Sequence, residues 1–374
     1  MIREGRPTGG LLQPLRHESK LRGWGVRVTT LRDECMKSIL ITGGAGFIGV
    51  NSARYFQERG WTVILLDNLS RQGAAENLDW LRRKAQIRFE RADVRNHEVM
   101  EHIIDEVRPD LVLHLAAQVA VTTSVRNPRE DFEINALGTL NVLEAIRLKS
   151  PESFFINAAT NKIYGKMEDI NAVERNGRYE YEDLPQGVSE DRPLDFHSPY
   201  GCSKGVADQY CIDYARIYGL ATVSFRQSCI YGTRQFGMED QGWVAWFTIA
   251  SVLGKQITIY GNGRQMRDIL HVEDLARAYE AAWEHREAVA GQAFNIGGGP
   301  SNTISLLELV SYLEEGLGIG VPVKWSDWRP GDQPVFVCNL DKAKRLLEWL
   351  PAIGVREGVG QLIAWVRDNR HLFN

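Results

Sequence analysis

The sequence has few cysteines and no cluster of them. Five are scattered over 374 residues, and no two stand in Cys-x-x-Cys spacing. This argues against a disulfide framework or a zinc site, so no metal is expected, and it fits a reducing cytoplasm. No apolar run approaches the ~20 residues of a membrane span. The net charge of −4 gives no pull toward nucleic acid or acidic membranes. We expect a cytoplasmic protein that binds neither.

Residues 1–35 lack the apolar core of a signal peptide, and they show little periodicity despite much Arg and Gly. Met36 then opens MKSILITGGAGFIG, which is typical of the start of an α/β domain. We expect residues 1–35 to be a disordered extension or an overlong gene-start assignment. A basic targeting or docking arm is the alternative.

From Met36 to about residue 227, short apolar runs alternate with helical patterns. The expected strands are 38–42, 62–67, 87–90, 111–115, 154–157 and 221–227, and the expected helices are 46–60, 97–107, 131–149 and 200–218. Nearly continuous apolar strands between helices are typical of a parallel sheet covered on both faces. Right-handed crossovers make such a sheet doubly wound. The pattern predicts an α/β, Rossmann-like fold.

After residue 227 the regularity weakens, while Gly and Trp become frequent. We expect a smaller, mixed α/β lobe packed over the carboxyl edge of the sheet, where loops can build a pocket. The predicted limits are 36–226 for the first domain and 227–374 for the lobe, with some segments of the lobe returning to the first domain. The polar stretch 166–197 is predicted to be a long insertion, functional or disordered.

Three glycines follow the first expected strand and lead into a helix: Gly43, Gly46 and Gly49. Glycines allow a tight turn and let backbone N–H groups approach a pyrophosphate. Asp67 closes the second strand, where a carboxylate binds ribose hydroxyls and repels a 2′-phosphate. This favours NAD over NADP, although Arg71 nearby is able to hold a phosphate and leaves the preference open.

Two further positions have two interpretations each. Asp93 either bonds the adenine amine or caps a helix, and Ala116 with Ala117 either leaves room for a cofactor or packs tightly. The full set expected around NAD is Gly43, Gly46, Phe47, Ile48, Gly49, Asp67, Asn68, Ser70, Arg71, Asp93, Val94, Leu115, Ala116, Ala117, Gln118, Tyr200 and Lys204.

Tyr200 and Lys204 stand four residues apart, which places both on one face of a helix. A phenol with a pKa near ~10 is a poor base at neutral pH, and a nearby ammonium lowers that pKa. The pair is therefore suited to deprotonate a hydroxyl while a cofactor removes hydride. Because this spacing also arises by chance, the pair alone is weak evidence for catalysis, and its context, the motifs around it, decides whether it is catalytic.

That context is a set of motifs: TGGAGFIG, LLDNLSR, ADVRN, HLAAQ, INALGTLNVLEA, NKIYG, SPYGCSK and RDILHVEDLARA. Together they resemble the extended short-chain dehydrogenase/reductases, the family of nucleotide-sugar epimerases and dehydratases, from Met36 nearly to the C-terminus. The resemblance implies that Tyr200 is the general base and that Lys204 binds the nicotinamide ribose and lowers the pKa of Tyr200. Thr160 occupies the family's catalytic Ser/Thr position.

The resemblance also bears on the reaction. Dehydratases of this family carry an Asp-Glu pair directly after the Ser/Thr, because elimination of water needs an acid and a base. Here Asn161 and Lys162 stand in those positions, so dehydration is disfavoured and epimerisation of a nucleotide sugar is expected. NAD should then be regenerated within each turnover and stay bound.

The runs QVAVTTS, ATNKIYG, LDFHSPYGCSKGVADQY and DQGWVAWF are similar to the family branch that inverts C2 of a CDP-linked dideoxyhexose. Epimerases that act at C4 or C2 of another UDP-, GDP- or CDP-hexose are the nearest alternative. A non-catalytic NAD-binding regulator is a third, which the intact Thr160, Tyr200 and Lys204 set argues against.

The family pattern further implies substrate contacts and an assembly. Arg267 and Arg329 are expected at the nucleotide diphosphate, with ordinary surface arginines as the alternative. Gln227 is expected over the sugar or the phosphate, and Asn161 and Thr123 near the sugar. For Thr123 an ordinary polar loop is the alternative. In this family the helices expected over 131–149 and 200–218 pair into a four-helix bundle, which implies a homodimer or homotetramer. Alternatively, their apolar faces only cover the sheet.

Overall fold

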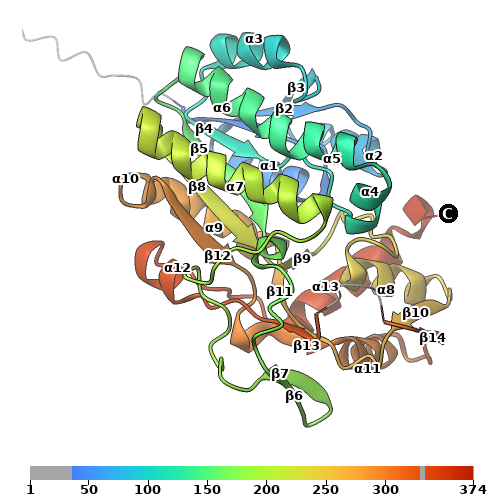
Figure 1. Cartoon of the computed structure of the whole chain (residues 1–374). Helices are drawn as coiled ribbons and strands as arrows, with labels where there is room; N and C mark the ends of the chain where they lie inside the picture. Colours follow the sequence, from blue (N-terminus) through green and yellow to red (C-terminus); the bar gives the residue numbers. More distant parts are fainter. Residues whose placement is uncertain (1–35, 329–332, 374) are drawn as a thin grey trace, which may run out of the picture. The chain divides into compact units, whose positions relative to one another are not determined.

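The central sheet has seven parallel strands in the order β3-β2-β1-β4-β5-β8-β12 (Figure 1). The strands are β1 (Ser38–Thr42), β2 (Thr62–Asp67), β3 (Arg88–Arg91), β4 (Leu111–His114), β5 (Phe154–Thr160), β8 (Thr222–Gln227) and β12 (Gln292–Ile296). This computed structural model describes residues 36–328 and 333–373; the predicted extension over 1–35 and Arg329 lie outside the described residues. The Rossmann-like fold predicted from the sequence is confirmed.

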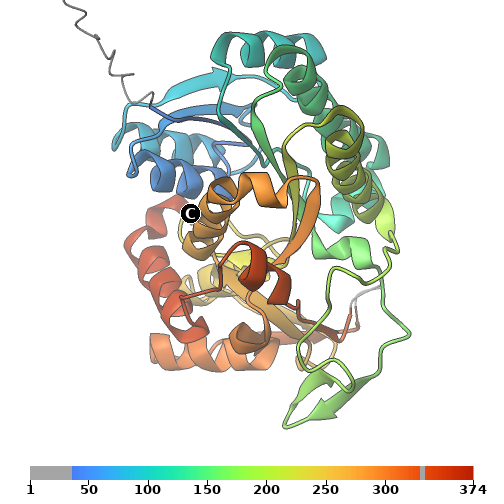
Figure 2. The same ribbon diagram turned by 90° about the vertical axis from the view of Figure 1, so that its left-hand side faces the viewer.

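Both faces of the sheet are buried, as the apolar strands predict. In β1, Ile39 and Ile41 pack into the core of one face, whereas Leu40 packs into the core of the other. The first face is covered by α1 (Phe47–Gln57), α2 (Ala74–Arg82) and α9 (Val272–Glu284). The second is covered by α3 (His97–Val107), α6 (Gly138–Lys149) and α7 (Ser198–Tyr218) (Figures 1 and 2). Consecutive side chains of a strand alternate between faces, so such strands need apolar residues at nearly every position.

The lobe lies beyond the carboxyl ends of the strands (Figure 1). The lobe has its own apolar core, which includes Val244, Ile257 and Leu309 and is separate from the two cores on the sheet. Its main elements are β9 (Cys229–Tyr231), α8 (Trp243–Val252), β10 (Ile257–Tyr260), β11 (Met266–His271), β13 (Thr303–Ser305), α11 (Leu306–Leu317), β14 (Val323–Ser326), β15 (Val335–Phe336) and α13 (Val355–Asp368). From Met36 onward the chain clusters as one compact unit, so the limits 36–226 and 227–374 remain a prediction.

One predicted helix is interrupted. Residues 131–149 were expected as one helix, but they span the end of α5 (Pro128–Phe132), a π-helical turn η1 (Glu133–Leu137) and α6. At this turn the Thr139 hydroxyl donates to the carbonyl of Asn135 at 2.6 Å, while the Asn135 side chain bonds to Gln118. Such side-chain bonds compete with the regular helical ladder, and π-turns often occur at functional sites.

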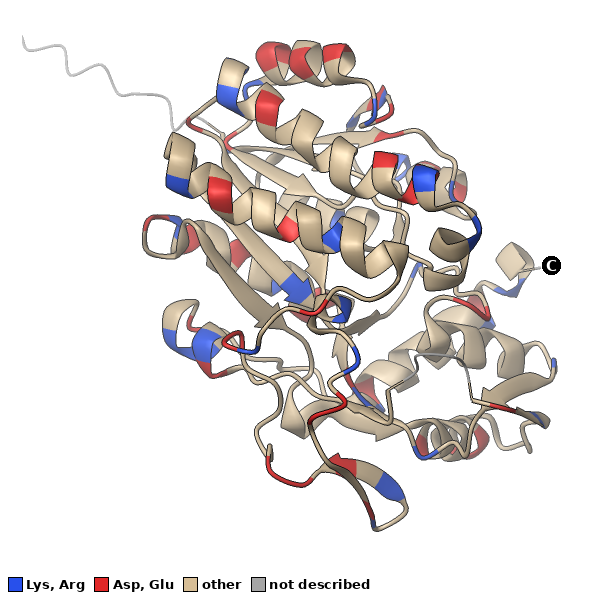
Figure 3. Cartoon of the chain, viewed as in Figure 1, with Lys and Arg blue, Asp and Glu red and all other residues tan. Residues whose placement is uncertain are grey.

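The insertion 166–197 contains a hairpin of β6 (Ala172–Arg175) and β7 (Arg178–Tyr181). The hairpin is anchored on the lobe: Arg178 pairs with Glu308 at 2.8 Å, and Asn262 donates to the Tyr179 hydroxyl at 2.9 Å. Acidic and basic residues are mixed over most elements (Figure 3). Within the described part of the chain, no helix combines the length and apolar character needed to traverse a bilayer.

Candidate active site

A cavity of about 430 Å³ lies at the carboxyl edge of the sheet. Every residue predicted around NAD lines it: Gly43, Gly46, Phe47, Ile48, Gly49, Asp67, Asn68, Ser70, Arg71, Asp93, Val94, Leu115, Ala116, Ala117, Gln118, Tyr200 and Lys204. They come from the ends of β1, β2, β3 and β4, from the first turn of α1 and from α7. Parallel strands end at one edge of a sheet, so residues far apart in sequence meet there.

The glycine turn after β1 leaves no room for side chains. Gly43 has φ +66°, and a Cβ on it would lie 2.7 Å from the backbone nitrogen of Ala116. A Cβ on Gly49 would lie 2.4 Å from the carbonyl oxygen of Gly43. The first turn of α1 therefore borders the cavity with backbone, and the N–H groups at a helix N-terminus attract an anion such as a diphosphate.

The carboxylates at the far end of the cavity are already engaged. Asp67 accepts hydrogen bonds from the backbone of Ala45 at 3.0 Å and of Leu69 at 2.7 Å; burial raises its pKa, while these N–H groups oppose the rise. Hydrogen bonds from Arg95 lower the pKa of Asp93 to about 2. Asp93 is not a helix cap, because the N-cap of α3 is Asn96. The interpretation of Asp93 as an N-cap was wrong.

A second cavity of about 200 Å³ adjoins the first, and Tyr200 and Gln227 line both. Thr160, at the end of β5, lines the second cavity only, and its side chain opposes the rise in the pKa of Tyr200. The ammonium of Lys204 donates to the carbonyl of Ala158. The side chains of Thr160, Tyr200 and Lys204 are all buried, and they stand at the wall between the two cavities.

Burial controls the ionisation of this group. It raises the pKa of Tyr200 to about 12, opposed by the Thr160 side chain and by the positive charge of Arg71. It lowers the pKa of Lys204 to about 8, opposed by the carboxylates of Asp131 and Asp208. Tyr200 therefore holds its proton at neutral pH until another positive charge comes near, since a cation stabilises the phenolate.

Comparison with known proteins places the chain. The family model for the NAD dependent epimerase/dehydratase family matches residues 39–297. The chain belongs to this family. A CDP-paratose 2-epimerase of Salmonella typhi is 46% identical over 332 residues, 87% of this chain and 98% of the relative. A putative UDP-glucose 4-epimerase of Methanocaldococcus jannaschii is 32% identical, over 88% of this chain and 99% of the relative.

Solved structures of epimerases have the same fold. The UDP-glucose 4-epimerase of Thermotoga maritima with UDP-glucose superimposes with a TM-score of 0.76 at 32% identity, covering 89% of this chain and 99% of that one. The Thermus thermophilus enzyme in complex with NAD gives a TM-score of 0.74 at 32% identity, with the same coverage. This member of the NAD dependent epimerase/dehydratase family is an enzyme, and NAD is its cofactor.

The residues of this family member fit that cofactor. The side-chain-free turn at Gly43 and Gly49 leaves backbone N–H groups for the diphosphate, and Asp67 lies near the end of β2 for ribose hydroxyls. Tyr200 and Lys204 lie at the opposite end, on α7.

The predicted substrate residues are divided by the structure. Thr123 lines the larger cavity, whereas Asn161 and Arg267 line neither cavity. Arg267 is buried on β11 and donates to the carbonyls of Met266 at 2.8 Å and Gln333 at 2.7 Å, among other interactions. Asn161 accepts from the Thr160 hydroxyl at 3.4 Å. The roles of Thr123, Asn161, Arg267 and Arg329 at a substrate stay predictions.

The sequence analysis missed one wall of the site. Gln235 and Gln241 line both cavities, and Phe236 and Gly237 line the larger one. They belong to the segment between β9 and α8. The signal that would have identified it is its pair of glycines: Gly242 has φ +75°, and a Cβ on Gly237 would lie 2.6 Å from the backbone nitrogen of Trp246.

Proposed function

We propose that the protein inverts C2 of a CDP-linked dideoxyhexose, converting CDP-paratose to CDP-tyvelose. The observation that carries this proposal is the buried Thr160 and Tyr200 pair at the wall shared by two cavities, one for the cofactor and one with room for a sugar. The choice of sugar rests on the 46% identity to the Salmonella typhi enzyme over nearly its whole length. Dehydration is disfavoured because Asn161 and Lys162 replace the carboxylate pair.

Each catalytic side chain has a role that follows from its contacts. When bound, NAD supplies reversible hydride transfer. Tyr200 takes the proton of the sugar hydroxyl at its phenolic oxygen and later returns it, while the Thr160 hydroxyl orients that oxygen. Lys204, bonded to the carbonyl of Ala158, places a positive charge one helical turn from Tyr200. Gln227 lines both cavities and is suited to hold the sugar between them.

The remaining contacts are proposals of the same kind. The residues around the larger cavity bind NAD, and the guanidinium groups of Arg267 and Arg329 bind the diphosphate of the sugar nucleotide, since arginine suits phosphate oxygens. Thr123 and Asn161 contact the sugar. Both Trp243 and Trp246 pack against the apolar core of the lobe, and Trp243 also lines the smaller cavity.

The test is an assay without added cofactor. The purified protein is incubated with CDP-paratose, CDP-glucose or UDP-glucose, and the products are read by NMR. We expect inversion at C2 of CDP-paratose only. In heavy water the hydrogen at C2 should be retained, because hydride leaves and returns without exchange. Inversion at C4 of UDP-glucose, or solvent deuterium at C2, would contradict the proposal.

We also propose a homodimer formed through α6 and α7. Some apolar residues of these helices cover the sheet, such as Leu143 and Tyr214, which are buried. Others face outward: Leu148, Tyr210 and Ile217 are 49%, 44% and 62% exposed. An apolar patch on neighbouring helices is typical of an interface. We expect twice the chain mass by light scattering, and a monomer after Tyr210→Glu with Ile217→Glu; a monomeric wild type would refute the proposal.

A further inference from the structure

Asp131 is a buried carboxylate that the proposed mechanism does not use. It lies at the end of α5 with no exposed surface. Its oxygens accept three hydrogen bonds, from the Ser203 hydroxyl at 2.5 Å, from Gln118 Nε2 at 2.8 Å and from Asn135 Nδ2 at 3.1 Å. Ser203 directly precedes Lys204, and Gln118 lines the cofactor cavity. Asp131 thus joins the wall of the cavity to the catalytic turn of α7.

The orientation of both amides makes Oδ1 of Asp131 an acceptor. The side-chain oxygen of Gln118 accepts from the backbone of Ala120 at 2.6 Å, and that of Asn135 accepts from the backbone of Gln118 at 2.9 Å. The amide nitrogens therefore face Oδ1 of Asp131, and the Ser203 hydroxyl donates to Oδ2. Both oxygens accept, as they do in an ionised carboxylate.

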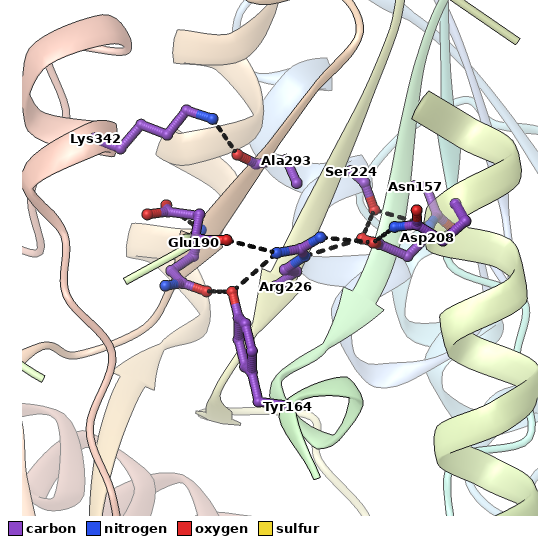
Figure 4. Close-up of polar contacts among 10 residues, drawn as sticks. Asn157, Tyr164, Glu190, Asp208, Ser224, Arg226, Ala293 and Lys342 are labelled. Carbon is purple, nitrogen blue, oxygen red and sulfur yellow. Dashed lines mark hydrogen bonds and ion pairs between the residues drawn. The ribbon is translucent and has the colours of Figure 1, made fainter. Parts of the chain in front are cut away.

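A second buried carboxylate near Lys204 is neutralised by a cation. Asp208, one turn further along α7, pairs with Arg226 at 2.9 Å, and both side chains are buried (Figure 4). Asp131 differs, because within the described residues its hydrogen-bond donors are a hydroxyl and two amides. Within the described residues Asp131 makes no ion pair like that of Asp208 with Arg226, so its charge acts on the Tyr200 and Lys204 pair.

We propose that Asp131 is a positioning residue for the proposed reaction: its charge keeps Lys204 an ammonium, and its bond to Ser203 fixes the catalytic turn of α7 against the cavity wall. The effect of Asp131 on turnover rests on the proposed function, whereas its effect on the charge of Lys204 does not. A buried ammonium needs such support, since burial disfavours the charged form.

The ionisation of the pair agrees with this assignment. Burial lowers the pKa of Lys204 to about 8, and the carboxylate of Asp131 is the first of two groups that oppose the fall. The same charge raises the pKa of Tyr200, adding to the effect of burial. The other charged groups around the pair are Asp208 with Arg226, and Arg71. His114 stays neutral, because burial lowers its pKa to about 3.

The test is Asp131→Asn, which removes the charge and leaves each hydrogen-bond partner of Asp131 with a bond. Gln118 and Asn135 both donate to Oδ1, and only Ser203 bonds to Oδ2. An Asn side chain keeps Oδ1 as the acceptor and donates from Nδ2 to the Ser203 oxygen. The Ser203 hydroxyl then donates to the carbonyl of Tyr200, which already lies 3.2 Å away. Asp131→Ser, which removes the same charge with a smaller side chain, is the second variant should the first not fold.

We expect both limbs of the pH profile of kcat to move to lower pH by about one pH unit, the lower end of the effect of a close charge. Loss of a negative charge destabilises the Lys204 ammonium and stabilises the Tyr200 phenolate, so both pKa values fall. The limbs report the coupled pair rather than either residue alone. A lower kcat with unmoved limbs would make Asp131 merely structural and overturn the proposal.

A second readout needs no substrate. In NAD-loaded protein with labelled lysine, the NMR signal of Lys204 is identified by its loss in Lys204→Met and is titrated with pH. Asp131→Asn should lower its midpoint, whereas Asp105→Asn, the same change on the exposed face of α3, should not. Ser203→Ala, which removes the bond and keeps the charge, should lower the melting temperature without moving the midpoint. An unchanged Lys204 midpoint in Asp131→Asn refutes the inference, and inactive wild type with a shifted midpoint refutes the proposed function alone.

Discussion

Tyr200→Phe should lower kcat about a thousandfold, the usual contribution of a positioned general acid and base, while NAD stays bound. The substitution removes one oxygen atom. The ring of Tyr200 is 8% exposed, and its packing on α7 is kept. What is lost is the only group at the shared wall that is proposed to take and return the sugar proton. Turnover is measured with CDP-paratose by NMR, and cofactor content by the absorbance of nucleotide released on denaturation.

Tyr218→Phe is the matched control, because it removes the same atom from an exposed position on the same helix and is not one of the residues substituted in the dimer test. It should leave turnover and cofactor content unchanged. Full turnover in Tyr200→Phe would remove Tyr200 from the mechanism. Loss of both turnover and NAD would assign Tyr200 to binding instead of proton transfer.

Local rules explain why so much of the cofactor cavity was predictable. β1 and β2 have the predicted limits, because each is a continuous apolar run bounded by a turn. The glycine turn is required by backbone geometry: a side chain on Gly43 or Gly49 would overlap the backbone. Since strand ends meet at one edge, residues that follow predicted strands were predicted to line one cavity, and they do.

Contacts between distant segments were not predictable in the same way. The run that forms β12 is short and includes two amide side chains, and nothing in it specifies pairing with β8, which ends 65 residues earlier. The Asp131 and Ser203 bond joins residues 72 apart. For Arg267 the sequence predicted a ligand, but it carried no sign of the bond from the guanidinium to a backbone carbonyl 66 residues away. Such partners follow from packing, on which periodicity and propensity carry no information.

Asp208→Ala should lower the free energy of unfolding by about 3–5 kcal/mol, the cost of leaving a buried charge without its partner. Arg226 on β8 would stay buried, with the Tyr164 hydroxyl at 3.1 Å and the Glu190 carbonyl at 3.4 Å as its remaining partners (Figure 4). Neither of these groups carries a charge. The Ser224 hydroxyl, which donates to Asp208 at 2.6 Å, would lose its acceptor as well. The measurement is urea denaturation followed by circular dichroism.

The double variant separates the lost charge partner from the lost volume. If the cost comes from the stranded guanidinium, Asp208→Ala with Arg226→Met should be more stable than Asp208→Ala alone, because an apolar side chain needs no counter-charge. Asp213→Ala, on the exposed face of α7, is the control and should not change stability measurably, since its pair with Arg216 is solvated. Additive losses in the double variant would mean that Asp208 acts through packing. A rescue would mean that the loss in Asp208→Ala comes from the stranded guanidinium of Arg226, and that the contact between α7 and β8 one turn beyond Lys204 does not itself require the ion pair.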